Sequence, residues 1–242
     1  MEAALILALL QARMSSSRLP GKVLKPVAGA PMILRQIERV RRAERIDRLV
    51  VATSDQPSDA PLASRLEEAG VEVFRGSLDD VLGRFLGALE AYPADHVVRL
   101  TADCPLADPG LIDAAIARHL ASGADYTANR VASAGYPKGQ DVEVITARAL
   151  RRAGAEAATP EAHEHVTWGV WNHPERYRIE RLAPPVDEGD IRWTVDRPDD
   201  LDFVRAVYAD LYPQNPAFSS DDVRAWVRAH PEWAEWGGDR RV

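Results

Sequence analysis

Short apolar segments alternate with helix-like stretches through the first half of the chain, and this order limits the possible folds more than any other feature. The apolar segments are residues 5–10, 49–52, 71–74 and 96–100. A continuous apolar run is typical of a strand buried on both faces, as in parallel sheets. Strands that alternate with helices predict a parallel sheet with right-handed crossovers. Ligands of such sheets bind at the carboxyl ends of the strands.

The second half of the chain has a different order of elements. Its predicted strands are residues 142–145, 178–182 and 193–195. Its predicted helices are residues 147–155, a helix that begins at Thr159 and Pro160, residues 199–211, and a last helix capped by Ser219 and Asp222. These elements extend the sheet, so we expect an α/β chain with a mixed, mostly parallel sheet and flanking helices.

Charge is distributed unevenly along the chain. The 242 residues include 30 Lys and Arg and 37 Asp and Glu, a net charge of −7. Such a balance disfavours a nucleic-acid coat protein or a basic membrane-surface protein. Residues 3–37 nevertheless have no acidic residue, and their cations are Arg13, Arg18, Lys22, Lys25 and Arg35. A positive segment on an acidic protein indicates either an anionic small ligand or chance clustering of surface cations.

The cysteine content and the lengths of the apolar runs bear on location. Cys104 has no second cysteine to pair with, which favours a reducing compartment. The longest apolar run, residues 3–10, is far shorter than the roughly 20 residues of a membrane helix. We therefore expect a cytoplasmic protein with no membrane insertion and no nucleic-acid partner. Cys104 itself is interpreted as a packed loop residue, because no base is placed to activate it.

The strongest functional pattern follows the first predicted strand. Residues 11–22 read Gln-Ala-Arg-Met-Ser-Ser-Ser-Arg-Leu-Pro-Gly-Lys. Backbone N–H groups and serine hydroxyls suit phosphate oxygens, and Arg13, Arg18 and Lys22 supply charged donors. A turn at Pro20-Gly21 would bring Lys22 back toward the same anion. The segment has neither the Walker A nor the dinucleotide-binding glycine pattern, and its alternative interpretation is a solvated basic loop.

Residues 12–22 resemble, without a gap, the sugar-acid cytidylyltransferase signature Ala-Arg-x-x-Ser-x-Arg-Leu-Pro-Gly-Lys. The chain is most similar to the spore-coat polysaccharide cytidylyltransferase-like branch, which is related to 3-deoxy-manno-octulosonate cytidylyltransferase. Further similar segments are residues 51–54, 75–77, 101–106, 141–144, 164–167 and 194–201. The resemblance implies a nucleotide-diphospho-sugar transferase-like (GT-A or Rossmann-like) fold. It also implies transfer of CMP from CTP to a sugar or sugar-acid hydroxyl, with release of pyrophosphate, for cell-surface polysaccharide biosynthesis.

The resemblance assigns roles to the loop and to later strand ends. The nucleotide-binding residues it implies are Ala12, Arg13, Ser17, Arg18, Lys22, Ser77 and Thr101. Lys22, Arg13 and Asp103 are implied as catalytic, and Asp103 and Asp196 as ligands of the cofactor Mg²⁺. This suits a cation that takes one or two protein carboxylates together with phosphates and waters. The alternative is a structural cap or turn at each aspartate.

Four residues of the second half are predicted to bind the acceptor: Gln140, Asp141, Glu143 and His165. Asp141 and Glu143 stand two apart on a predicted strand, so both side chains project from one face. These carboxylates would hold the hydroxyls of a polyol, assist a metal, or accept the sugar proton. The alternative is that they form the solvated face of an edge strand. By resemblance, His165 lies on the acceptor-binding side. The equally supported alternative is that it is a hydrogen-bonded, partly buried histidine of the structure.

Two other groups carry weaker patterns. His163 and His165 would diverge by roughly 200° on a helix, and residue 167 is Thr instead of the histidine of a zincin site, so joint zinc ligation is not expected. Arg75 and Arg192 are spare cations that would suit a substrate carboxylate.

Together these features predict one cytidylyltransferase domain at residues 1–236, with a nucleotide-binding half at about 1–125, an acceptor and dimerisation half at about 126–236, and a frayed tail at 237–242. The expected partners are CTP and a sugar or sugar-acid acceptor, and the resemblance implies a homodimer. One alternative is a nucleotide-sugar-dependent glycosyltransferase of the same fold, although Asp103-Cys104-Pro105 lacks the Asp-x-Asp typical of those enzymes. The other is a non-catalytic nucleotide-binding protein, against which the intact loop argues.

Overall fold

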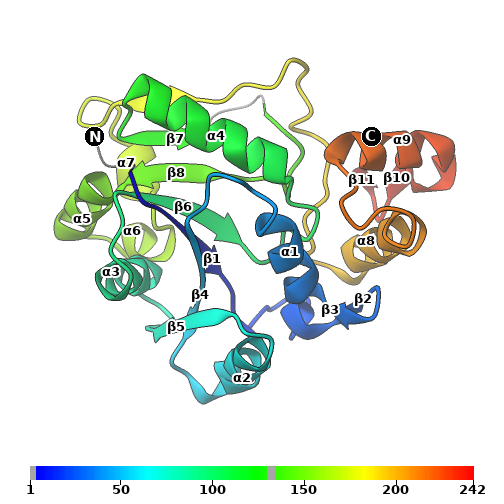
Figure 1. The fold of residues 1–242 in the computed structure, drawn as a ribbon, viewed down its shortest axis with the longest axis horizontal. Helices are drawn as coiled ribbons and strands as arrows, with labels where there is room; N and C mark the ends of the chain where they lie inside the picture. The colour runs from blue at the N-terminus through cyan, green and yellow to red at the C-terminus, as the bar shows by residue number, and fades with distance from the viewer. Residues whose placement is uncertain (1–3, 130–134) are drawn as a thin grey trace.

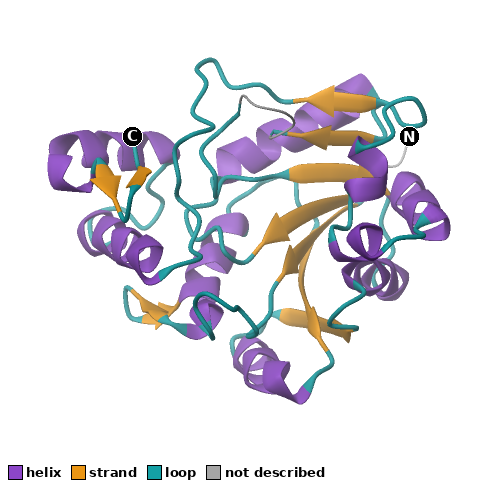
Figure 2. Ribbon diagram, turned by 180° about the vertical axis from the view of Figure 1, so that it is seen from behind, coloured by secondary structure: helices purple, strands orange, loops and turns teal. Residues whose placement is uncertain are grey.

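The computed structural model describes residues 4–129 and 135–242, and a mixed sheet runs through its centre (Figures 1 and 2). Among these residues the sheet has seven strands in the order β5-β4-β1-β6-β8-β7-β9. The strands are β1 (Ile6–Gln11), β4 (Arg48–Ser54), β5 (Glu72–Gly76), β6 (His96–Thr101), β7 (Tyr126–Ala128), β8 (Glu143–Thr146) and β9 (Ile179–Arg181). β1, β4, β5 and β6 are parallel, whereas β8 is antiparallel to β6. The predicted mixed, mostly parallel sheet is confirmed.

Helices cover both faces of this sheet. The α-helices of the described residues are α1 (Met32–Val40), α2 (Ala60–Glu68), α3 (Val81–Ala91), α4 (Pro109–Ser122), α5 (Ala147–Glu156), α6 (Pro160–Glu164), α7 (Trp168–Trp171), and, beside the sheet, α8 (Pro198–Leu211) and α9 (Ser220–Ala229). Ala8 and Leu10 of β1 belong to the core under α1, α2 and α4, whereas Leu7 and Leu9 belong to the core under α3, α5 and α7. Because both sides of β1 are buried, its sequence is apolar from Ile6 to Leu10 rather than alternating.

The C-terminal part forms a third apolar core beside the sheet, at the right of Figure 1. Its helices α8 and α9 pack around the fully buried Trp193. The indole Nε1 of Trp193 donates a hydrogen bond to the carbonyl oxygen of Arg241, at 2.8 Å. This bond and the packing fix the extended segment that carries Asp196.

Several short elements complete the structure. They are the hairpin of β2 (Pro26–Val27) and β3 (Ala30–Pro31), the hairpin of β10 (Glu235–Trp236) and β11 (Asp239–Arg240), and the 3₁₀ turns η1 (Lys22–Leu24), η2 (Pro57–Asp59) and η3 (Pro231–Trp233). The predicted helix caps are confirmed, because Thr159 caps α6 ahead of Pro160 and Ser219 forms a capping box with Asp222. In the part of the chain that the structure describes, no helix has the length and apolarity to cross a membrane.

Two sequence-based predictions in the C-terminal half are wrong. Residues 193–195 form no strand, because their backbone N–H groups bond to two separate segments: Trp193 and Thr194 to Lys138, and Val195 to Asp103. Residues 237–242 are not a frayed tail. They contain β11, and the side chain of Arg241 is fully buried against Asp200.

Candidate active site

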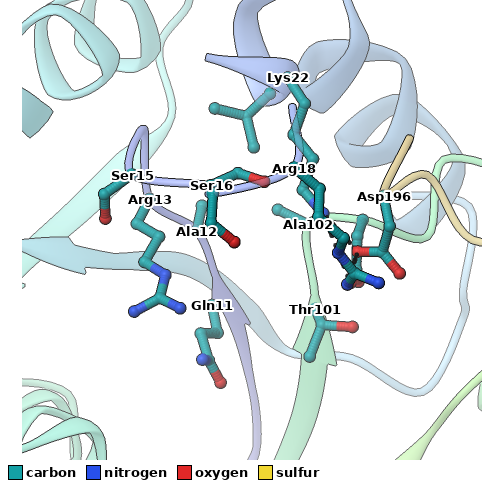
Figure 3. Close-up of a pocket in the computed structure, with 13 residues that line it drawn as sticks. Gln11, Ala12, Arg13, Ser15, Ser16, Arg18, Lys22, Thr101, Ala102 and Asp196 are labelled. Carbon is teal, nitrogen blue, oxygen red and sulfur yellow. Dashed lines mark hydrogen bonds and ion pairs between the residues drawn. The ribbon is translucent and has the colours of Figure 1, made fainter. Parts of the chain in front are cut away.

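The predicted phosphate loop and the Asp103 loop leave the sheet at the same edge. Gln11 at the end of β1 pairs in register with Thr101 at the end of β6. The two loops and Asp196 enclose a first cavity of about 260 Å³ (Figure 3). The predicted site residues that line it are Ala12, Arg13, Ser17, Arg18, Lys22, Thr101, Asp103 and Asp196. Most of the residues that line this cavity were therefore among the site residues predicted from the sequence.

Local bonds shape the loop of residues 12–22. Gly21 adopts φ 67°, a left-handed conformation that glycine tolerates without strain, and its N–H donates to the carbonyl of Met14 at 3.0 Å. The N–H of Met14 in turn donates to the buried carboxylate of Asp59, at 2.6 Å. The predicted turn at Pro20-Gly21 is closed by the N–H of Lys22, which donates to the carbonyl of Leu19 at 3.2 Å, and the Lys22 side chain points back into the cavity.

Lys22 stands between the two predicted metal carboxylates. Its Nζ lies 3.0 Å from Asp196 Oδ1 and 3.7 Å from Asp103 Oδ2, and it also donates to the carbonyl oxygen of Val195 at 2.7 Å. The Lys22 side chain is only 11% exposed. This ammonium group is thus fixed in position before any ligand enters, which favours electrostatic stabilisation of an anion.

Asp196 is surrounded by cations. Its Oδ1 also lies 3.0 Å from Arg18, and its Oδ2 accepts from Arg192 at 2.8 Å. Burial opposes ionisation of Asp196, but the hydrogen bond and charge of Lys22, together with Arg192 and Arg18, outweigh it and hold the pKa of this carboxyl below its usual value. Asp196 is therefore ionised at neutral pH.

The carboxylates of Asp103 and Asp196 fit a magnesium ion that is completed by substrate. Both line the first cavity, on the two sides of Lys22, and the Asp103 side chain is 31% exposed. Mg²⁺ takes an octahedron of oxygens, usually with few protein carboxylates and with phosphates and waters in the remaining positions. No group of three or more His, Cys, Asp or Glu with metal-binding geometry occurs within residues 4–129 and 135–242, so a metal here would need the phosphates.

A buried ion network behind Asp196 escaped the sequence analysis. Asp200 is fully buried and accepts from Arg192, from Arg241 and from the backbone N–H groups of Asp196 and Arg197. Burial opposes its ionisation, but these donors hold the pKa of Asp200 far below its usual value. Arg192, interpreted from sequence as a spare substrate cation, is instead part of this network. The one local signal for this network in the sequence was Asp200 itself, an acidic residue in the first turn of the helix that begins at Pro198.

Arg13 borders a second cavity as well as the first. This cavity, of about 370 Å³, lies between the loop and the helices α3 and α6, and its other polar lining residues include Asp80 and His163. His163 Nδ1 lies 2.8 Å from Asp80 Oδ1, whereas His165 lines a different cavity. The two histidines are separated, as their spacing predicts. Arg13 makes no hydrogen bond or ion pair with any residue that the structure describes, so its charge faces the cavities unneutralised.

A third cavity contains two of the predicted acceptor residues. It has a volume of about 430 Å³, and its lining residues are Arg99, Glu143, Glu161, His165, Thr167, Trp168 and Trp171. Arg99 Nη1 donates to Glu143 Oε1 at 2.7 Å, and its Nη2 donates to Gln11 Oε1 at 3.3 Å. Because Gln11 lines the first cavity, the bond between Arg99 and Gln11 links a wall residue of the third cavity to a wall residue of the first. Sequence analysis missed Arg99, since a charged residue within a strand predicts no particular partner.

Three other predicted site residues lie outside these cavity walls. Gln140 is 2% exposed, and its amide donates to the Leu106 carbonyl and to the Ser220 hydroxyl, so it ties a loop to α9 instead of facing an acceptor. Asp141 precedes β8 and accepts from the N–H of Gly139 at 2.9 Å. The Ser77 hydroxyl accepts from the N–H of Asp80 at 3.0 Å, ahead of α3.

Two remaining interpretations concern single residues. Cys104 is buried, and burial raises the pKa of its thiol well above the usual value, so it is a packed loop residue and no nucleophile. Arg75 donates to the carbonyl oxygens of Ser54 and Gln56, each at 3.0 Å, and so braces the end of β4.

The comparisons with known proteins agree with this geometry. A family model described as Cytidylyltransferase matches residues 7–212. The spore coat polysaccharide biosynthesis protein SpsF of Bacillus subtilis strain 168 is 35% identical over 236 residues, which cover 95% of this chain and 96% of that protein. The 3-deoxy-manno-octulosonate cytidylyltransferase of Trichlorobacter lovleyi is 36% identical over 113 residues, 46% of this chain and 43% of that protein.

A solved structure shares the fold. The chain superposes on a cytidylyltransferase from Leptospira borgpetersenii serovar Hardjo-bovis with a TM-score of 0.89 and 27% sequence identity, covering 95% of this chain and 96% of that one.

Proposed function

The chain belongs to the cytidylyltransferase family, and on that premise we propose that it transfers CMP from CTP to a hydroxyl group of a sugar or sugar acid, with Mg²⁺ as cofactor. The observation that carries the proposal is the first cavity, where the cations Arg13, Arg18 and Lys22 meet Asp103 and Asp196. A triphosphate requires clustered cations and its metal requires carboxylates, and one cavity offers both. The name of the relative SpsF supports a product used in cell-surface polysaccharide biosynthesis.

The three cations of the loop would bind the triphosphate. Arg13 is uncommitted, and Arg18 is mostly exposed with its guanidinium at the mouth of the cavity, so both can turn toward phosphate oxygens. Lys22 is fixed between Asp103 and Asp196, where it would stabilise the negative charge that develops on the α-phosphate and on the leaving pyrophosphate. Phosphoryl-type transfer depends mainly on positioning and on such charge stabilisation.

Asp103 and Asp196 would hold Mg²⁺ against the phosphates. When bound, such an ion would supply polarisation of the phosphate and a lower pKa for the attacking hydroxyl. Asp196 is ionised and preorganised by Arg192, and Asp103 presents a partly exposed carboxylate.

The acceptor would enter the third cavity, in which Glu143 and His165 are the predicted binding residues. Arg99 and Gln11 separate this cavity from the first one. A sugar in that position would approach the α-phosphorus from the side of β1 and β6, and its hydroxyl oxygen would attack in line while pyrophosphate leaves.

The remaining parts of the proposal are a single domain, a homodimer and a cytoplasmic location. The homodimer rests on the resemblance to the family, and the cytoplasmic location rests on the lone cysteine.

Thermal unfolding with separate nucleotides tests the proposal. With Mg²⁺ present, CTP should raise the unfolding temperature while UTP, ATP, GTP and a UDP-sugar do not, because a ligand at about 100 times its Kd stabilises by about 2.7 kcal/mol. The shift should be lost in Lys22→Ala, and CTP should release pyrophosphate when a panel of sugars and sugar acids is added. A shift with the UDP-sugar alone would instead indicate a glycosyltransferase. Binding of CTP with no pyrophosphate release from a broad panel would indicate a non-catalytic protein.

A further inference from the structure

Asp59 stands where an aspartate usually caps its own helix, but its side chain has a different set of partners. It immediately precedes α2, the position from which a carboxylate normally accepts from the free N–H groups of the first helical turn. The Asp59 side chain makes no such bond to α2, all of which the structure describes. It is instead turned into the protein and fully buried. Burial of a carboxylate is costly, so this departure from the local rule indicates another role.

The carboxylate of Asp59 joins the ends of two neighbouring strands. Its Oδ1 accepts from the N–H of Met14, at 2.6 Å, in the loop that follows β1. Its Oδ2 accepts from the hydroxyl of Ser54 and, at 3.3 Å, from the N–H of the same residue at the end of β4. Because β1 and β4 are parallel and adjacent, these contacts lie at the same edge of the sheet as the first cavity.

Met14 is the residue through which Asp59 acts on the loop of residues 12–22. The N–H group that Asp59 holds belongs to the planar peptide that links Arg13 to Met14, so this bond fixes the orientation of that plane. The carbonyl oxygen of Met14 accepts from the N–H groups of Ser16, at 2.9 Å, and of Gly21, at 3.0 Å. Met14 thus connects the buried carboxylate to two further points of the loop.

Arg13 depends on this arrangement more than the other two cations of the loop. Lys22 and Arg18 each form an ion pair with Asp196. The Arg13 side chain lines the first and second cavities, and within residues 4–129 and 135–242 it has no hydrogen bond or ion pair. Its direction is therefore set by the backbone that carries it, and the next peptide of that backbone is fixed by Asp59.

We propose that Asp59 is a positioning residue of this site: its carboxylate orients the peptide between Arg13 and Met14 and thereby directs the guanidinium of Arg13 toward the triphosphate. The inference rests on the proposed function, and it adds a buried residue behind the loop to those on which nucleotide binding depends. A carboxylate suits this role because both of its oxygens accept, whereas an asparagine would present a donor to one of the two segments.

Asp59→Asn tests the inference in the full chain, because it keeps the volume of the side chain and replaces one acceptor oxygen by a donor. The Kd for CTP with Mg²⁺, measured by calorimetry, should rise about tenfold, the scale of losing one hydrogen bond to a charged group. Asp47→Asn is the matched control and should leave the Kd unchanged, since Asp47 Oδ2 accepts from the N–H of Ile6, at 2.7 Å, at the opposite end of β1. An unchanged Kd in Asp59→Asn would overturn the inference. Failure of the wild-type chain to bind CTP would contradict the proposed function and the inference with it.

A double variant separates positioning from a general loss of stability. Since Asp59 acts through Arg13 in this proposal, Arg13→Ala and the double variant Arg13→Ala/Asp59→Asn should bind CTP with the same Kd, because both changes remove one shared interaction. Effects that multiply would overturn the inference. The unfolding temperature without nucleotide verifies that each variant is folded, and Asp59→Ser, which removes the buried charge altogether, is the second variant. Misfolding of both Asp59 variants would show a structural role instead and would also overturn the inference.

Discussion

Lys22 Nζ lies 3.0 Å from Asp196 Oδ1, although 174 positions separate the two residues in the sequence. The loop after the first strand is thereby joined to a segment fixed by the third apolar core and by Arg192. The cation proposed for the phosphates and a carboxylate proposed for the metal are thus positioned by each other, so we expect a change at either one to affect both roles.

Replacement of Lys22 by alanine is expected to reduce pyrophosphate release by roughly a hundredfold or more, the scale of losing one fixed electrostatic stabiliser. Folding should be retained, because Asp196 keeps its ion pairs with Arg18 and Arg192. Steady-state pyrophosphate release and the unfolding temperature check both statements. Lys25→Ala, three residues farther along the chain and outside the wall of the first cavity, is the matched control. Near-normal turnover of Lys22→Ala would refute the role.

Asp103→Asn is expected to reduce turnover by a similar factor of about a hundred and to raise the concentration of Mg²⁺ needed for half-maximal activity. The amide keeps the shape of the side chain but removes the charge that would hold the metal. Turnover measured across a magnesium titration separates this effect from a general loss of structure. If the variant shows the wild-type magnesium dependence, Asp103 is not a metal ligand.

Arg241→Ala is expected to lower the free energy of unfolding by about 3 kcal/mol, because it removes one partner of a buried ion pair. Both side chains of the pair with Asp200 are fully buried. Arg240→Ala is the matched control, since its partner Asp190 is exposed and such pairs contribute less than about 1 kcal/mol. Denaturant unfolding of the two variants gives the comparison, and equal losses would contradict the assignment.

Stability is expected to fall in mild acid because of His119. Burial, with a smaller contribution from His96, lowers the pKa of His119 to about 4, below the value of about 6.5 in an unfolded chain. Between these values the unfolded state binds the extra proton. The stabilisation is therefore complete above about pH 6.5 and is lost, by at most about 1.4 kcal/mol per pH unit, as the pH falls toward about 4.

His119→Gln should flatten this part of the curve of unfolding free energy against pH. The exposed His173→Gln should leave it unchanged. An identical pH dependence in the wild-type protein and His119→Gln would show that His119 does not titrate in this way.

The sequence predicted the parts of the structure that depend on local pattern. The apolar runs gave the parallel strands, and the loop signature gave Arg13, Arg18 and Lys22 as residues of one cavity, because a strand end delivers the loop to a fixed edge of the sheet. Residues 193–195 were mistaken for a strand, since the strand-favouring sequence Trp-Thr-Val does not reveal that its backbone partners are two unrelated segments.

Long-range partners were beyond prediction for the same physical reason. No residue near Asp200 in the sequence indicates that Arg241 is its partner, because the two side chains meet only through their burial in the third core. Likewise Gln140 was predicted to bind the acceptor, but its amide donates to Leu106 and Ser220 instead.

Arg99 donates to Gln11 on one side and to Glu143 on the other, so a single guanidinium in the wall of the third cavity is bonded to a residue of the first cavity. If the first cavity binds CTP and the third binds the acceptor, as proposed, recognition of the two substrates is not modular. Residues that share a partner do not vary independently in their energetic effects. A substitution at Glu143 that changes the choice of sugar would then also disturb the wall of the first cavity, and we expect it to require matching substitutions at Arg99 and Gln11.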